Sequence, residues 1–275
     1  MSDLRTTIAA ASTPAEIIGA ISQLVREEDK LYRFGSFSIS IYDTAWLSMV
    51  YREEDGRVSW LFPASFQYVL RSQQDDGTWT SYASHVDGIL NTLASLLAFL
   101  IHKEMSRIDS EYDRIDLSRR IEKAREGLDS LLQNWSVGDV MQVGSEVLVP
   151  SLLRQMRNRG IFFDFPGHHR LDDLQTKKIG SFKPEMVYTK ESTTVLHSLE
   201  ALVGLIDFDK VGHHCTEEVG ILGSPAATAA YLLNASAWDD RAESYLRKVV
   251  LEYSNCGGVP SAFPTCMFEI SWVST

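Results

Sequence analysis

Several carboxylates stand close enough together in the sequence to bind a metal ion, and the densest group is Asp239-Asp240-Arg241-Ala242-Glu243. Clustered carboxylates are typical ligands of Mg²⁺ and of Mg²⁺-bound diphosphate. The same group also begins a predicted amphipathic helix, where the helix dipole favours acidic residues in the first turn. Because acidic residues are common in the first turn of a helix, we interpret the group as a helix start.

A second candidate metal site is the short segment His213-His214-Cys215. No second cluster of ligands follows it at the spacing that metal sites require, so we interpret the segment as a polar loop. The cysteines Cys215, Cys256 and Cys266 are odd in number and show no metal-ligand spacing. This usage indicates a reducing compartment, and we expect a cytoplasmic protein.

Three single residues are also candidates for catalysis or binding. Glu146 stands in an otherwise apolar stretch, where a buried carboxylate requires a partner, either a metal or backbone amides at a helix start. Asp43 is either a catalytic acid or, as we favour, the cap of a helix that begins at Thr44. His197 lies among leucines and valines, and its spacing alone favours a core histidine that contacts Glu200 one turn on.

The elements that must position these residues are predicted to be helices. Apolar residues recur at helical spacing along much of the chain. The predicted helices cover 14–33, 62–73, 87–102, 117–132, 146–159, 193–206, 225–235 and 242–250. Strand signals are weak: the segments 37–41 and 140–149 carry them, and neither is followed by a hairpin partner.

Glycine-rich turns separate these helices at two comparable places. Gly77 follows one predicted helix, and a second turn leads to Ser224 and Pro225, which suit the cap and first turn of the next. These two units suggest a weak internal repeat. Short helices in antiparallel pairs predict an all-α fold that closes into an α/α-barrel. Trp46, Trp60 and Trp79 are interpreted as core residues of it, with walls that stabilise a cation as the alternative.

Composition excludes several classes of function. The 275 residues are 44% hydrophobic and 23% charged, as in a folded globular protein, and the net charge of −11 argues against nucleic-acid binding. Met1-Ser2-Asp3-Leu4-Arg5 leads into no apolar signal segment. The longest apolar run, which ends at Ile101, is far shorter than the ~20 residues that span a bilayer. We therefore expect a soluble protein without a membrane span, and a buried helix at this run.

Seven segments together resemble one known family. They are YDTAW (42–46), WLFP (60–63) with the following QQDDGTW (73–79), DGILNTLA (87–94), GSE (144–146), TTVLHSLE (193–200), GSPAAT (223–228) and GGVPSAFP (257–264). In this order and at about this spacing, they resemble class II diterpene cyclases of the copalyl diphosphate synthase type, fungal-like. The resemblance extends from residue 14 to the last residue.

The resemblance implies a division into domains. In that family a barrel called the γ domain is inserted after the first helix of a second barrel, the β domain. Residues 1–33 would then be the amino-terminal segment and first β-domain helix, 34–265 the γ domain, and 266–275 the start of the returning β-domain helix. The Asp-x-Asp-Asp acid that starts cyclisation in this family lies in the β domain, and this sequence contains no such motif.

The resemblance also implies a substrate, a cofactor and two residues that bind them. Family members protonate geranylgeranyl diphosphate and close it to a bicyclic diphosphate with Mg²⁺ as the cofactor. Glu146 matches the family's γ-domain glutamate that helps to hold Mg²⁺. Lys178 matches its diphosphate-binding lysine, although one extra residue before Pro184 leaves Lys177 and Lys183 as alternatives.

The resemblance also implies which two residues act at the end of the reaction. In plant members a histidine and an asparagine hold the water that removes the final proton. His197 matches the histidine, which reverses the interpretation that spacing alone favours. Ser261 stands where the plant enzymes have the asparagine, so a shorter hydroxyl would place the water differently.

Three functions are compatible with these residues. The first is the γ-domain portion of a diterpene cyclase, which needs the β domain of the same protein as its partner and is inactive alone. The second is a non-catalytic helical module for interaction or assembly. The third, an unrelated barrel that acts on glycans, is disfavoured by the seven collinear segments. Homo-oligomerisation stays open.

Overall fold

The structure is a computed structural model, and it describes residue 13 and residues 37–54, 57–80, 83–105, 114–138, 144–253 and 256–265. The helix predicted over 14–33 and the segment 266–275 lie outside the described residues. The domain boundaries predicted after residues 33 and 265 therefore stay predictions.

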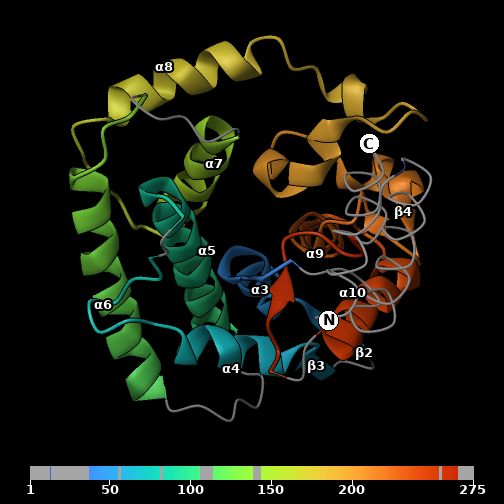
Figure 1. Ribbon diagram of the computed structural model, residues 1–275, viewed down its shortest axis with the longest axis horizontal. Coiled ribbons are helices and arrows are strands. Elements are labelled where there is room, and N and C mark those ends of the chain that lie inside the picture. The colour runs from blue at the N-terminus through green and yellow to red at the C-terminus, as the bar shows by residue number, and fades with distance from the viewer. Residues whose placement is uncertain are drawn as a thin grey trace.

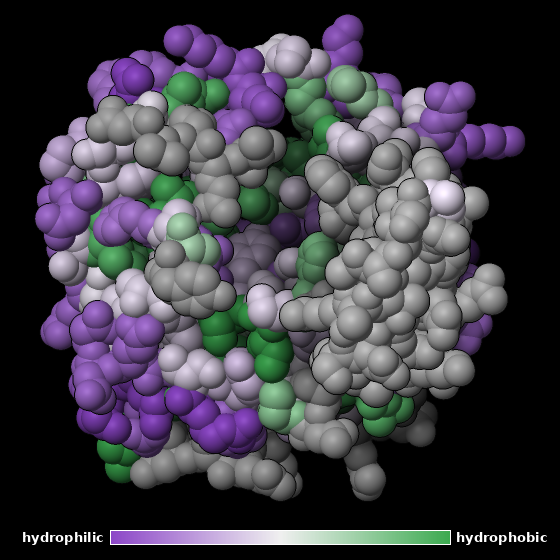
Figure 2. Space-filling view, in the orientation of Figure 1, coloured by the Kyte–Doolittle hydropathy of each residue, from purple (hydrophilic) through white to green (hydrophobic). Residues whose placement is uncertain are grey.

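An inner ring of helical segments forms the centre of the molecule (Figure 1). It consists of α3 (Ile41–Ser48), α5 (His85–Glu104), α7 (Ser145–Arg157), η2 (Thr194–Leu202) and α9 (Pro225–Asn234). Each of these segments contacts the next, and α9 contacts α3, so the ring is closed. The face drawn in Figure 2 is hollowed near its centre, over this ring.

Outer helices cover the ring one by one. They are α4 (Pro63–Arg71) on α3, α6 (Arg114–Gln133) on α5, α8 (His168–Ile179) on α7 and α10 (Asp240–Tyr253) on α9. In Figure 1, α6 and α8 follow the outer edge while α5 and α7 lie inside them. The predicted all-α fold with an α/α-barrel is confirmed.

Short strands and 3₁₀ turns connect the helices. Three antiparallel ladders pair β1 (Ile39–Ser40) with β6 (Val259–Pro260), β2 (Tyr51–Glu54) with β3 (Arg57–Trp60), and β4 (Cys215–Thr216) with β5 (Gly220–Ile221). Further 3₁₀ segments are η1 (Pro184–Val187), η3 (Phe208–Lys210) and η4 (Gly212–His214). The strand signal at 37–41 is thus real, but its partner β6 comes from the far end of the barrel sequence.

The central helix α5 has a capped start and a buried apolar face, which are the features of a core helix. Ser84 caps it by accepting a hydrogen bond from the Asp87 amide at 3.0 Å, and its apolar residues, such as Leu93 and Leu97, are fully buried. Among the described residues, α5 alone is long and apolar enough to cross a membrane. However, 78% of its most apolar window is buried inside the protein, as expected for the core helix that the sequence predicts.

The two predicted turns are present. Ser224 caps α9 by accepting from the Ala227 amide at 3.2 Å, and Pro225 occupies the first helical position. Gly77 has a φ of +86°, and a Cβ on it would lie 2.2 Å from the carbonyl oxygen of Lys123 on α6. Only glycine permits both this backbone conformation and this close approach.

Two predicted features differ in the structure. The helix expected over 193–206 is a 3₁₀ segment ending at Leu202 and kinked at Ser198, where φ and ψ are −122° and 43°. Its start, Thr193-Thr194-Val195, is β-branched and disfavours an α-helix. The helix predicted over 146–159, by contrast, is present as α7, in agreement with the rejection of the weak strand signal at 140–149. Asp43 caps no helix at Thr44, because α3 begins at Ile41 with Ser40 as its cap.

Candidate functional site

Glu146 and Lys178, which the sequence singled out separately, form an ion pair. Oε1 of Glu146 lies 3.2 Å from Nζ of Lys178. The carboxylate comes from the first turn of α7 and the ammonium group from the last turn of α8, and these helices pack on each other. Lys177 and Lys183 are exposed and form no ion pair within the described part of the chain, so the geometry favours Lys178.

The second carboxylate oxygen of Glu146 fits a metal ligand. Oε2 is buried without a hydrogen-bond partner among the described residues, and Glu146 as a whole is 8% exposed. A buried oxygen in this state is costly unless something binds it. No group of three His, Cys, Asp or Glu side chains that suits a metal occurs in the described ranges. These residues therefore fit Mg²⁺ held by one carboxylate together with phosphate oxygens and water, rather than a metal held by protein alone.

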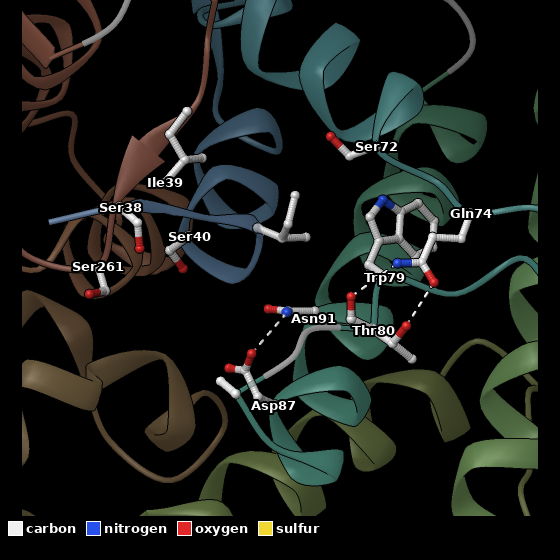
Figure 3. A pocket seen from close by; sticks show the side chains of 12 residues that line it. Ser38, Ile39, Ser40, Ser72, Gln74, Trp79, Thr80, Asp87, Asn91 and Ser261 are labelled. Carbon is white, nitrogen blue, oxygen red and sulfur yellow. Dashed lines mark hydrogen bonds between the residues drawn. The ribbon is translucent and has the colours of Figure 1, made fainter.

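A cavity of about 320 Å³ lies at one end of the inner ring (Figure 3). One wall carries Ser38, Ser40 and Ser261, and the opposite wall carries Ser72, Gln74 and Trp79. Thr80, Asp87 and Asn91 lie between these walls, and Ile39, Ile41 and Ala83 complete the lining. The cavity lining thus consists of hydroxyl groups, amide groups, one carboxylate and the indole ring of Trp79, together with a few apolar side chains.

Ser261 and His197 lie in different positions relative to the cavity. Ser261 lines the cavity, while His197 is not part of its lining. His197 is an exposed residue of η2, directly before the kink at Ser198. The protein around its ring lowers the pKa of His197 by partial burial, so the imidazole is neutral at pH 7 and able to accept a proton.

Two further buried acids, Asp43 and Glu200, lie close enough together inside the barrel to affect each other's charge. Asp43 on α3 accepts hydrogen bonds from the Ser40 hydroxyl at 2.6 Å and from the Ala226 amide, at the start of α9, at 3.2 Å. Burial raises the pKa of Asp43 to about 6, although these two hydrogen bonds favour the ionised form and lower the pKa. Asp43 therefore does not cap a helix at Thr44, and its structural role is to bind a first-turn amide of α9, the helix that Ser224 caps.

The second of these acids is Glu200, which the sequence predicted only as a partner of His197. Its Oε1 instead accepts from the Tyr42 hydroxyl at 3.2 Å, and its Oε2 has no hydrogen-bond partner among the described residues. Burial raises the pKa of Glu200 to about 8, and the charge of Asp43 adds to the shift. The carboxyl group is thus mostly protonated at neutral pH.

Asp87 and Asn91 line the cavity but were not predicted as site residues from the sequence. They stand four residues apart on α5, and the Asn91 amide donates to Asp87 at 3.4 Å. Two polar side chains at this spacing in an apolar helix share one face, and this was the available signal. Gln74 and Thr80 gave no such signal, because a loop brings them together through bonds of 2.7 and 3.0 Å.

The remaining candidates have structural partners. Asp239 accepts from the Arg241 amide at 3.0 Å at the start of α10, as expected of a helix-start acid. His213 and His214 bind the carbonyl oxygens of Thr189 and Val187 at 2.7 and 3.1 Å, so they tie a loop together.

The three tryptophans also have core contacts. Trp46 and Trp79 are each 2% exposed, and Trp60 stacks on His102 with ring centroids 3.6 Å apart. Of these, only Trp79 also lines the cavity, with its indole nitrogen bonded to the Val69 carbonyl at 2.9 Å.

Comparison with known proteins shows which proteins this barrel is similar to. No protein-family model matches the chain. The chain is 43% identical over 267 residues to the copalyl diphosphate synthase of Talaromyces verruculosus, which is 94% of this chain and 28% of that protein. It is 47% identical over 256 residues to the pimaradiene synthase of Emericella nidulans, covering 92% and 26%. The chain thus spans about a quarter of the length of the curated relatives that it matches.

Solved structures have the same fold. The abietadiene synthase from Abies grandis matches with a TM-score of 0.72 at 22% identity, over 94% of this chain and 32% of that one. The ent-copalyl diphosphate synthase from Arabidopsis thaliana matches with a TM-score of 0.68 at 27% identity, over 91% and 35%. The helical fold is therefore that of the terpene cyclases. By sequence and by fold, the chain thus matches one part of class II diterpene cyclases.

Proposed function

We propose that this chain is the γ-domain portion of a class II diterpene synthase. The complete enzyme protonates geranylgeranyl diphosphate and cyclises it to a copalyl-type bicyclic diphosphate. Support for this substrate comes from the Arabidopsis thaliana neighbour, whose solved structure holds (S)-15-aza-14,15-dihydrogeranylgeranyl thiolodiphosphate. In this proposal residues 34–265 are the γ domain, and the segments 1–33 and 266–275 belong to the β domain.

The observation that carries the proposal is the pair Glu146–Lys178. Thirty-two positions separate the two residues in the sequence. They were selected because they match a metal-binding and a diphosphate-binding residue, and their side chains meet at 3.2 Å. The ammonium group has three donors and its side chain is 58% exposed, so it can also reach a phosphate oxygen.

Mg²⁺ would be held at this corner by Oε2 of Glu146, and its chemical contribution is to neutralise charge on the diphosphate. Lys178 binds the same diphosphate and keeps Glu146 oriented. Together they fix the polar end of the substrate, so that its hydrocarbon chain is held in one position relative to the acid.

The chain is proposed to be inactive when isolated. An alkene is a very weak base, so its protonation requires a strong acid held in an apolar environment without water. The described buried acids do not meet this need. Burial raises the pKa of Asp43 and of Glu200, while Glu146 and Glu243 form ion pairs with basic side chains. The acid must come from the β domain.

The proposal is tested by joining this chain to a β domain. In the joined enzyme, this chain replaces the segment that it matches in the Talaromyces verruculosus copalyl diphosphate synthase. We expect the joined enzyme, with Mg²⁺ and geranylgeranyl diphosphate, to form a bicyclic diphosphate, and the isolated chain to form none. The products are dephosphorylated and identified by mass spectrometry, with the unmodified relative as the positive control.

Two outcomes contradict this function. Bicyclic product from the isolated chain would show that the acid lies within it. A joined enzyme that folds, as judged by a cooperative thermal transition, yet forms no bicyclic product would favour the non-catalytic helical module instead.

The roles of Glu146 and Lys178 give a separate prediction. In the joined enzyme, Lys178→Ala is expected to raise the Michaelis constant roughly tenfold or more, because a charge-assisted contact contributes about 1–3 kcal/mol. Glu146→Gln is expected to weaken the dependence of the rate on Mg²⁺. Steady-state kinetics over a series of Mg²⁺ concentrations measure both effects. Lys177→Ala, one position away and exposed, is the matched control, and unchanged kinetics in both test variants would remove the pair from the site.

A further inference from the structure

The cavity wall formed by β1 and β6 presents three hydroxyls on one face. The ladder pairs Ile39 with Pro260 and Ser40 with Val259, so the same register places Ser38 beside Ser261. Residues two apart on a strand point to the same side, which puts Ser38 and Ser40 on one face. All three serines line the cavity, and Figure 3 shows them together on one wall.

Ser40 links this wall to a buried acid. Its hydroxyl donates to Oδ2 of Asp43 at 2.6 Å and accepts from the Asp43 amide at 3.2 Å. A hydroxyl has one donor and two acceptor positions, so one acceptor position stays free to bind a cavity water. The Ser40 hydroxyl is therefore a direct connection between the cavity and Asp43.

Asp43 is able to receive a proton at neutral pH. Its carboxyl group is 5% exposed, and its pKa of about 6 leaves it mainly ionised at pH 7. The titratable groups around it are Tyr42 on the same helix, Glu200 on η2 and Tyr245 on α10. Burial keeps the pKa of each of these three higher, so they are protonated at neutral pH and Asp43 is the acceptor of the group.

We infer that Asp43, acting through Ser40, receives the proton that ends cyclisation. The inference rests on the proposed function. A water bound at Ser261 takes the proton from the carbocation, and the electrons of the broken C–H bond form the C=C bond of the product. The water passes a proton to Ser40, which releases its own proton to Oδ2 of Asp43. Asp43 becomes a neutral carboxylic acid and is a positioning residue, because it acts through Ser40.

The Asp43→Asn variant separates this role from the structural one. Asparagine keeps a carbonyl oxygen that can accept from the Ala226 amide, so the cap of α9 is retained while the proton acceptor is lost. Ser40→Thr keeps a hydroxyl at the cap of α3, whereas Ser40→Ala removes it. Ser72→Ala is the matched control, because the Ser72 hydroxyl lines the same cavity but is bonded to the Tyr68 carbonyl at 2.9 Å.

A first test uses the isolated chain and no turnover. Carboxyl carbon NMR is expected to show Asp43 titrating near pH 6, well above the ordinary value of about 4. Ser40→Ala should raise this pKa further, since the lost hydrogen bond favours the ionised form. Ser72→Ala should leave it unchanged. A normal titration of Asp43 that does not respond to Ser40→Ala overturns the relay.

A second test uses the joined enzyme. Asp43→Asn and Ser40→Ala are expected to shift the products several-fold from deprotonated to hydroxylated bicycles, and Ser40→Thr and Ser72→Ala to keep the parent ratio. The parent enzyme should lose deprotonated product as the pH falls through about 6, and Asp43→Asn should lack this dependence. A parent ratio and pH profile in Asp43→Asn overturn the relay. A joined enzyme without any bicyclic product contradicts the proposed function instead, and the titration then decides on the relay alone.

Discussion

Replacing His197 by alanine in the joined enzyme is expected to reduce the formation of deprotonated bicyclic product by roughly 10²-fold or more, because His197 is proposed to help hold the water that acts as the base for the final proton. The pKa of His197 is lowered by partial desolvation of its ring, so the imidazole is neutral and able to accept a hydrogen bond from that water. Cations that are not deprotonated should be captured by water, which gives hydroxylated or rearranged bicycles. Ser261→Ala should shift the same ratio more mildly.

The product ratio by mass spectrometry, with rates, measures this effect. His213→Ala is the matched control, because His213 is an exposed histidine whose ring binds the Thr189 carbonyl outside the cavity. If His197→Ala and Ser261→Ala both give the parent products at the parent rate, neither residue holds the water that removes the final proton, and both are structural.

The second large effect concerns stability and depends on Glu200. Burial raises the pKa of its carboxyl group from 4.5 to about 8, so the folded protein holds a proton there that the unfolded chain releases. Between these two pH values the folded state binds more protons, and the free energy of unfolding therefore falls as the pH rises. At ~1.4 kcal/mol per pKa unit, the total loss is on the order of a few kcal/mol. Glu200→Gln should abolish this loss.

Urea unfolding of the isolated chain at a series of pH values checks this expectation. Asp43 contributes a similar loss only up to a pH of about 6, and histidines such as His102 contribute equally to both proteins, so the difference between the parent protein and Glu200→Gln above pH 6 reports on Glu200. The gap between Glu200→Gln and the parent protein should widen across that interval. Glu191→Gln, an exposed glutamate near η2, is the control. An equal pH dependence in parent and Glu200→Gln would show that Glu200 ionises normally.

Much of the helical architecture could be predicted because it is encoded locally. The apolar spacing of α5 and the Ser224 cap of α9 depend only on neighbouring residues, and both appear in the structure. The helix α8 was missed because Leu171 is its one buried residue, so no apolar stripe marks it. The kink at Ser198 was also missed, since packing around η2 decides it and not the eight-residue motif.

The candidate site was less predictable, because its parts are far apart in the sequence. The resemblance selected Glu146 and Lys178 individually, but only the packing of α7 on α8 joins them. The cavity likewise combines β1, the turn after α4, the start of α5 and Ser261. Its hydroxyls carry no sequence signal, since isolated serines are ordinary in turns and caps. Asp43 was read as a local cap, and its actual partner Ala226 lies on another helix.

The β1–β6 ladder brings the two ends of the barrel together, which favours its insertion into another protein. It holds Ile39 opposite Pro260, so the described barrel starts and finishes at neighbouring strands. A host protein that receives such a unit needs to bridge only the few ångströms between paired strands, as it does at an ordinary hairpin. The host's own fold is then little disturbed by a guest of more than two hundred residues. We therefore expect the barrel to be exchangeable between related proteins as one unit, and the joined enzyme depends on this property.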